Sequence, residues 1–246
     1  MKRALDLVLL IAAGLVAWEA MHLAAPFALT SPAESLAKAW SMALSPVFWP
    51  HAAETAKAFA YTLLLAVGGG LALGLSLGLN RTSAEVAEPI MISAYSLPKV
   101  TLYPVILLIF GLGISAKIAF GVIHGIIPVI LFTMNAVRNI RAVYLRSARA
   151  MRLTVAQTAG TIIIPAALPE IVSGFRIGFA LTLLGTLIGE MFASQRGIGY
   201  MLVKAMETGD TATVMSLALL LVVLATAASA ALLALDRRLR RHAIAA

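Results

Sequence analysis

One apolar stretch of the chain combines two prolines with a lysine, residue types that could together line a path for a polar solute. Pro98 and Pro104 flank Lys99 within the apolar residues 85–111. Each proline lacks a backbone N–H and disfavours helical geometry at the preceding residue. Inside a bilayer the freed carbonyls need partners or a water-lined cavity. The pattern predicts a broken helix at a candidate translocation pathway.

Two ionisable residues are further candidates for this pathway. Counting about 1.5 Å per residue from Glu88 places Lys99 roughly 16 Å into the bilayer, near its midplane. If the span begins later, Lys99 extends its side chain to the interface instead, and both alternatives remain open. Glu190 falls near the outer end of another apolar run, 171–193. Because a carboxylate in a membrane is costly to bury, we expect it at an external gate.

Residues for enzymatic catalysis are not apparent. The chain has no cysteine, and its 4 histidines are scattered without metal-ligand spacing. We therefore predict no catalytic residue, no metal, no cofactor and no enzyme activity, which disfavours a membrane enzyme.

The composition indicates a membrane protein. The 246 residues are 61% hydrophobic and 12% charged, whereas soluble domains average about 45–50% apolar and about 25% charged. The formal net charge is +8, but the basic residues gather in a few loops and one tail without aromatic interleaving. This argues against nucleic-acid binding.

The apolar runs predict an all-α, polytopic membrane helix bundle with about six transmembrane helices. The predicted spans are 4–25, 58–79, 85–111, 116–136, 171–193 and 211–235. We divide the chain into a first helix with an outer interfacial segment (1–57), a permease core (58–240) containing a cytoplasmic loop (138–169), and a basic tail (236–246). The first run also resembles a signal peptide, but the following membrane segments need no cleavage.

The basic residues set the orientation. With both termini in the cytoplasm, that side receives most of the 19 lysines and arginines, as the positive-inside rule requires. These are Lys2, Arg3, Arg81, Arg138, Arg141, Arg146, Arg149, Arg152, Arg237, Arg238, Arg240 and Arg241.

Small residues recur every four positions in the second predicted span. Ala66, Gly70, Gly74 and Gly78 form a groove that lets a neighbouring helix approach closely. We expect tight helix packing here; sliding of this ridge during gating is the alternative.

The segment 138–169 is polar and contains the run 144–159, which is rich in helix-forming residues. It is too polar to span the bilayer. It either offers a short cytoplasmic helix to a soluble partner or lies on anionic lipid through its arginines. The residues alone do not decide between these interpretations.

This segment resembles the cytoplasmic loop of binding-protein-dependent ABC importer permeases of the nitrate/sulfonate/taurine group. Their loop carries the motif E-A-A-x3-G-x9-I-x-L-P, which aligns here with Ile162, Ile164 and Pro165, while Arg146 and Arg152 replace the usual Glu and Gly. Supporting similarities occur at 96–98, 110–113, 165–169, 173–176, 190–191 and 197–200. The resemblance covers about residues 55–240.

The resemblance implies a type I importer subunit in the bacterial inner membrane, coupled to a cytoplasmic ATPase and an extracytoplasmic binding protein. It implies a coupling helix at residues 148–154, with Arg149 and Arg152 on the ATPase and Met151 and Leu153 as apolar anchors. The coupling residues are Ala148, Arg149, Ala150, Met151, Arg152, Leu153, Thr154 and Pro165.

The resemblance also implies a second permease copy, most simply in a homodimer, and a small anionic cargo such as nitrate, a sulfonate or taurine. The chain has no G-x-x-x-x-G-K-[ST] loop, so ATP would bind to another subunit. A self-sufficient secondary transporter is the alternative function. It would predict internal repeats and paired intramembrane carboxylates, which the sequence lacks.

Overall fold

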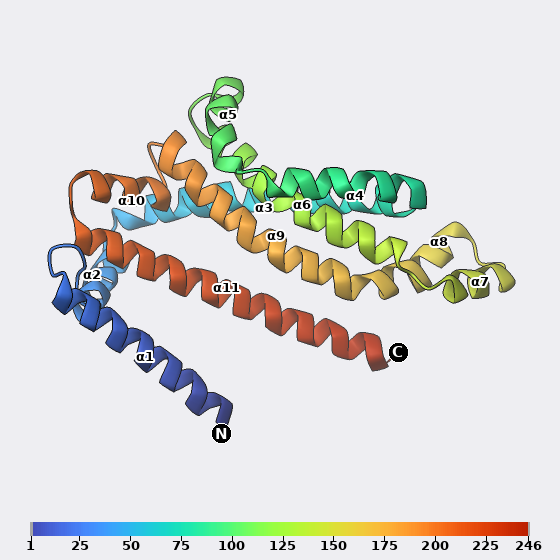
Figure 1. Ribbon diagram of the computed structural model, residues 1–246, viewed down its shortest axis with the longest axis horizontal. Helices are drawn as coiled ribbons and strands as arrows, with labels where there is room; N and C mark the ends of the chain where they lie inside the picture. The colour runs from blue at the N-terminus through green and yellow to red at the C-terminus, as the bar shows by residue number, and fades with distance from the viewer. Residues whose placement is uncertain (1, 246) are drawn as a thin grey trace.

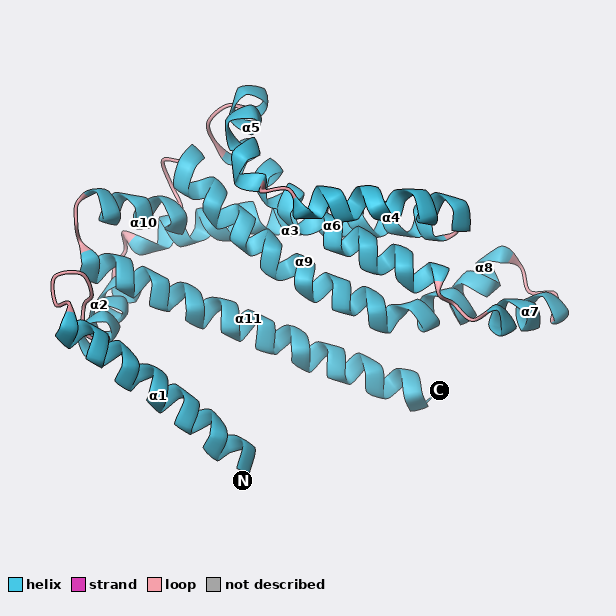
Figure 2. Cartoon of the chain, viewed as in Figure 1, coloured by secondary structure: helices cyan, strands magenta, loops and turns pink. Residues whose placement is uncertain are grey.

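The fold is given by a computed structural model that describes the backbone of residues 2–245. Side chains are described except at 2–4, 155, 156, 193 and 235–245, so those of the tail arginines lie outside the described part. Every regular element in the described backbone is helical (Figure 2). The order is α1 (Lys2–Ala24), α2 (Pro32–Leu44), α3 (Phe48–Gly78), α4 (Arg81–Ser96), η1 (Lys99–Leu102), α5 (Tyr103–Phe110), α6 (Ile114–Arg138), α7 (Ala142–Ala150), α8 (Val155–Thr158), η2 (Ala159–Ile163), α9 (Ile164–Ala193), α10 (Ile198–Glu207) and α11 (Thr211–Ala245).

The helices confirm the predicted all-α membrane bundle. Five stretches in the described residues are long and apolar enough to cross a bilayer, namely those of α1, α3, α6, α9 and α11. A sixth span results if α4 is joined to η1 and α5, although the chain bends by 84° between them. The predicted break in the third span is therefore present.

The two ends of the bundle differ in what they carry. Figure 1 shows α2 and α10 at one end and α7 and α8 at the other, with α11 leading from the first end toward the second. The second end holds the turn before Arg81 and the arginines from Arg138 to Arg152. We call it the basic end, and it matches the side that the sequence assigns to the cytoplasm.

Three helices form the core, with α6 packed against both α3 and α9. The buried face of α3 repeats every three or four residues, as one helix face requires, and consists of small side chains: Thr55, Ala58, Thr62, Ala66, Gly70, Gly74 and Gly78. In contrast, the spanning stretches of α1 and α11 contain almost no buried residues, 0% and 6%.

The glycine ridge brings α3 and α6 into backbone contact. A Cβ atom added at Gly70 would lie 2.6 Å from Val129 Cβ, and one at Gly78 would lie 2.7 Å from the carbonyl oxygen of Met134. The same closeness occurs between α6 and α9, where a Cβ at Gly185 would lie 2.9 Å from the Cα of Gly121. The predicted tight packing is confirmed.

Two spanning helices begin earlier than the sequence analysis expected. Helix α3 starts at Phe48 rather than at residue 58, so a domain boundary at residue 57 would fall inside a continuous helix. Helix α9 starts at Ile164 rather than at residue 171, with Pro165 in its first turn and Pro169 inside it. Pro165 is tolerated because the first turn of a helix has no intrahelical partner for its N–H groups. The non-spanning loop is correspondingly shorter than 138–169.

The packing predicts different effects on stability for two alanine substitutions in α3. Gly74→Ala places a Cβ 2.6 Å from Thr133 Cβ and 2.9 Å from the carbonyl oxygen of Ile130, so we expect destabilisation by about 1–3 kcal/mol. Gly68→Ala meets no atom within 4 Å and serves as the matched control, which should be as stable as the parent. Thermal unfolding in detergent measures both, and equal stability of the two variants would contradict this packing.

Candidate functional site

The cytoplasmic loop forms a compact arm at the basic end. Its main element, α7, buries Ala148, which is 2% exposed, and half-buries Leu145 against the bundle. The arm also exposes Val143, Tyr144 and Met151, the last by 62%. The arm therefore presents apolar side chains to the outside that its own chain does not cover.

Helix α7 ends in a Schellman motif. The N–H of Leu153 donates to the carbonyl of Ala148 (3.0 Å), and the N–H of Arg152 donates to that of Arg149 (3.0 Å). This pair of bonds requires a left-handed residue just beyond the helix, and Arg152 adopts φ +52°, the one positive φ of a non-glycine residue in the described backbone. Arg152 is also where the related motif has Gly, so the geometry explains why that motif uses Gly.

A capping box follows immediately. The Thr154 N–H donates to Gln157 Oε1 (2.9 Å), and the Gln157 N–H donates to Thr154 Oγ1 (3.3 Å), which is the reciprocal pairing that starts a helix. The expectation of one coupling helix over residues 148–154 is therefore wrong. The helix covers Ala142–Ala150, and Met151–Thr154 form the turn between two capping motifs. The composition of residues 144–159 predicted helix throughout, because composition does not show that Arg152 adopts a left-handed conformation.

The outer surface of the arm is cationic. Arg141, Arg146, Arg149 and Arg152 are exposed, and no acidic residue occurs between Arg138 and Glu170. Arg141 lies over the Tyr144 ring, 4.7 Å from its centroid. Arginines interleaved with exposed apolar groups suit an acidic cleft on a protein with an apolar floor.

Polar contacts between α4 and α6 form the base of the arm. Arg138 at the end of α6 pairs with Glu88 of α4 at 2.6 Å, and Asn135 also donates to Glu88 (3.4 Å). A cavity of about 590 Å³ lies between this base and Leu145 of α7. Pro165 follows the π-helix η2 and is exposed, away from the outer surface of α7.

The proline break directly follows the end of α4. Helix α4 ends at Ser96, Pro98 precedes η1, and Pro104 lies in the first turn of α5. Helix α4 rises about 22 Å from Arg81 to Ser96 at 1.5 Å per residue, and the chain then bends by 84° before Lys99, so both alternatives for the depth of Lys99 remain open. The Lys99 Nζ donates to the Tyr95 carbonyl (3.0 Å) and lies 4.8 Å from the centre of the Tyr95 ring.

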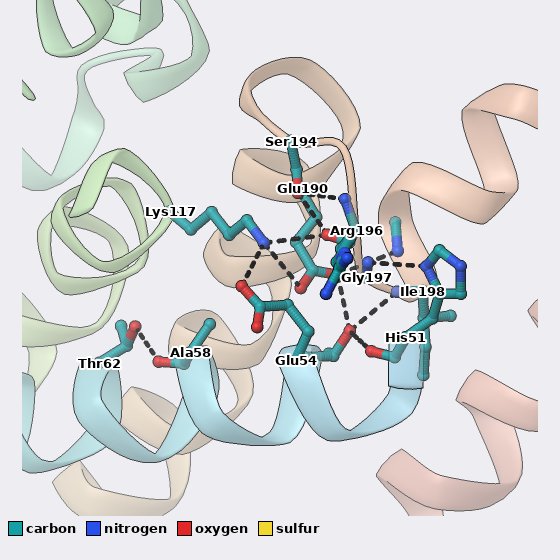
Figure 3. A network of polar contacts seen from close by, with 12 residues as sticks. His51, Glu54, Ala58, Thr62, Lys117, Glu190, Ser194, Arg196, Gly197 and Ile198 are labelled. Atoms are coloured by element: carbon teal, nitrogen blue, oxygen red, sulfur yellow. Dashed lines mark hydrogen bonds and ion pairs between the residues drawn. The ribbon is translucent and has the colours of Figure 1, made fainter. Parts of the chain in front are cut away.

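Glu190 lies in a buried polar network near the other end (Figure 3). It is 0% exposed, and its Oε2 accepts from Thr55 Oγ1 (2.8 Å) and from the Gly199 N–H (3.0 Å). Its Oε1 lies 3.8 Å from Lys117 Nζ. Glu190 thus joins α3, α6, α9 and the start of α10, and in this conformation it does not face an open path.

Lys117 is the functional candidate that sequence reasoning missed. It is 1% exposed, pairs with Glu54 at 3.2 Å and donates to the Arg196 carbonyl at 2.9 Å. The available signal was a lysine in an apolar run with carboxylates in two other predicted elements. Which carboxylate it meets depends on how α3, α6 and α9 cross, which no local pattern contains.

Removing the Lys117 ammonium should strongly destabilise the folded protein. Lys117→Met leaves the buried Glu190 without its cation, and breaking such a pair costs about 3–5 kcal/mol. Thermal unfolding of the purified protein measures the loss, and adding Glu190→Gln should recover part of it. Lys204→Met removes an exposed pair with Glu207 and is the control, expected to change stability by less than about 0.5 kcal/mol. Equal effects of the two lysine substitutions would contradict the assignment.

Two substitutions of Arg152 should change the stability of the turn after α7 in different directions. Arg152→Gly relieves the left-handed geometry and should leave the turn as firm or firmer, whereas Arg152→Val should loosen it by about 1–2 kcal/mol. Arg146→Gly, within α7, is the control and should loosen the helix by about 1 kcal/mol. Hydrogen–deuterium exchange of a peptide covering residues 142–158 reports each change. Faster exchange in Arg152→Gly than in the parent would be inconsistent with the motif.

The chain is similar in sequence to several known transport permease proteins. The chain is 28% identical over 224 residues to the taurine transport system permease protein TauC of Escherichia coli K12, covering 89% of this chain and 82% of that protein. It is 26% identical over 198 residues to the formylaminopyrimidine transport permease protein ThiX of Halalkalibacterium halodurans, covering 80% and 79%. The match to the putative aliphatic sulfonates transport permease protein SsuC of Bacillus subtilis, at 29% over 148 residues, spans 60% of this chain and about half, 54%, of that relative.

The fold is similar to that of a chain in the MetNI methionine ABC transporter, solved in inward facing conformations. The TM-score is 0.59 at 22% identity, and the match covers 77% of this chain and 93% of that one. The family model of binding-protein-dependent transport system inner membrane components matches residues 66–241. The resemblance inferred from the sequence is confirmed: the chain belongs to the family of binding-protein-dependent transport system inner membrane components.

Proposed function

We propose that this chain is the membrane permease subunit of an ATP-driven importer, located in a bacterial inner membrane, and that α7 is its contact with the motor. The observation that carries the proposal is the exposed surface of the arm. The arm exposes Met151 by 62% among arginines without a nearby acid, and two successive capping motifs order the turn that follows α7.

A stiff arm is what force transmission requires. A flexible loop would change shape when the motor moves. A helix joined by short connections to α6 and α9 would transmit the movement to them. Arg149 and Arg152 would contact acidic groups of a separate cytoplasmic ATPase subunit, and Met151 and Leu153 would fill an apolar depression. ATP binds and is hydrolysed on that subunit, which makes the present chain a transport component.

A second permease copy, in a homodimer, would complete the pathway. The nearly unburied apolar faces of α1 and α11 are available to lipid and to that copy. Pro98, Lys99 and Pro104 border the pathway where the third span is broken. Glu190 belongs to its outer closure, because its network ties together the helices that would separate when the outer side opens.

The cargo would be a small anion handed over by an extracytoplasmic binding protein. Two of the relatives are named for taurine and for aliphatic sulfonates. Lys99, at the break of the third span, would supply a positive charge on the path of such a solute.

The motor contact is tested by placing two negative charges on the arm. Arg149→Asp with Met151→Asp should abolish co-purification of the ATPase subunit from the native host, because it replaces a cation and an apolar anchor by two anions. The matched control is Lys204→Asp with Met206→Asp in α10, a cation and a methionine at the same spacing that are exposed at the opposite end.

Both double variants should insert into the membrane in normal amounts, measured by quantitative blotting of membrane fractions. An ATPase that still co-purifies with the arm variant would refute the docking assignment. Solute uptake by the purified permease without any nucleotide-hydrolysing partner would support a secondary transporter instead.

A further inference from the structure

Arg176 is an arginine inside a spanning helix. It follows the start of α9 by 12 residues, about 18 Å along a helix about 45 Å long at 1.5 Å per residue. Its side chain is exposed at the surface of the single chain, and within the described residues it takes part in no ion pair. A charge at this depth is costly against lipid and generally faces a water-filled cavity or a partner.

Arg176 lines a cavity of about 480 Å³ between α4, α9 and α11. The cavity lining includes Tyr95, Ser173, Arg176, Ala180 and Ser229. Arg176 is its one charged member. Tyr95 follows the start of α4 by about 21 Å at 1.5 Å per residue, so α4 and α9 contribute residues at similar depth.

The hydroxyl groups around Arg176 differ in availability. Ser173 Oγ already donates to the carbonyl of Pro169 (3.0 Å). The hydroxyls of Tyr95 and Ser229 make no hydrogen bond within the described part of the chain. Two unused O–H donors beside one guanidinium form a set that favours an acceptor with a single negative charge. Lys99, over the ring of Tyr95, adds a second cation.

We propose that this cavity is the anion-binding station of the translocation pathway, with Arg176 as the residue that selects a small monovalent oxyanion such as a sulfonate or nitrate. The proposal rests on the proposed import function and names the side chain that recognises the cargo within the membrane. A volume of hundreds of Å³ accommodates such an anion with water. Arg176 gives a planar pair of N–H donors that matches two oxyanion oxygens.

The absence of cysteine in the chain allows a direct test by thiol labelling. Ala180→Cys places a thiol on the cavity wall one helical turn beyond Arg176. The variant, purified with its ATPase partner in nanodiscs of zwitterionic lipid, is treated with an anionic reagent, 2-sulfonatoethyl methanethiosulfonate, and with its trimethylammonium counterpart. Labelling rates are compared with Arg176 retained, as Arg176→Lys and as Arg176→Gln.

We expect Arg176→Gln to slow the anionic reagent by about tenfold without slowing the cationic one, on the scale of one charge–charge contact in a partly hydrated site. Arg176→Lys should keep most of the preference. Millimolar methanesulfonate should protect the thiol only when the cation is present, and neutral dimethyl sulfone, of similar shape, should not protect it.

Three outcomes would overturn the proposal. A thiol that neither reagent reaches in the folded complex means that lipid or a second copy covers Arg176. Equal slowing of both reagents by Arg176→Gln means that the residue acts on structure alone. Protection by added phosphatidylglycerol but not by methanesulfonate means that Arg176 holds a lipid phosphate. If the ATPase partner still co-purifies in these cases, the importer assignment stands and the anion station alone is wrong.

Discussion

The structure depends on the backbone contact of α6 with both α3 and α9. Apolar side chains give helices in lipid little reason to associate, so small residues that allow close approach supply the van der Waals contact instead. Gly70, Gly74 and Gly78 on one side and Gly185 on the other remove the side chains that would hold the helices apart. Once α6 is fixed, Lys117 near its start meets Glu54 and Glu190, and Arg138 at its end meets Glu88. The polar contacts at both ends of the bundle are thus consequences of this packing.

The same helix links the two ends mechanically. Beyond Arg138 the chain passes through only three residues, 139–141, before α7 begins. The Schellman turn and the capping box then lead it through α8 and η2 into α9. A displacement of α7 is therefore delivered to α6 and α9, the two helices that also carry Lys117 and Glu190. The buried network at the far end is well placed to respond, because separating a buried charged pair is costly.

The errors in the sequence-based prediction have physical causes. The resemblance implied a coupling helix over residues 148–154, and composition favoured helix over 144–159, whereas Arg152 ends α7 by adopting a left-handed conformation that composition does not reveal. Helix α9 begins before Pro165 and Pro169 because prolines near a helix start cost few hydrogen bonds. Glu190 was correctly singled out as unusual, but its burial against Thr55, Lys117 and Gly199 required the crossing of three helices.

The sequence by itself determined the membrane class, the approximate spans, the break at Pro98, the basic end and the family, because hydropathy, proline chemistry and charge placement are local properties that a bilayer reads residue by residue. Tertiary structure alone decided which ionisable groups are partners and which are left without one. Lys117 and Arg176 are both cations in apolar runs, yet Lys117 is buried and paired with two carboxylates, whereas Arg176 is exposed and has no ion-pair partner among the described residues. The difference arises from the rotation of α6 and α9 about their axes, which is set by packing between helices far apart in the chain.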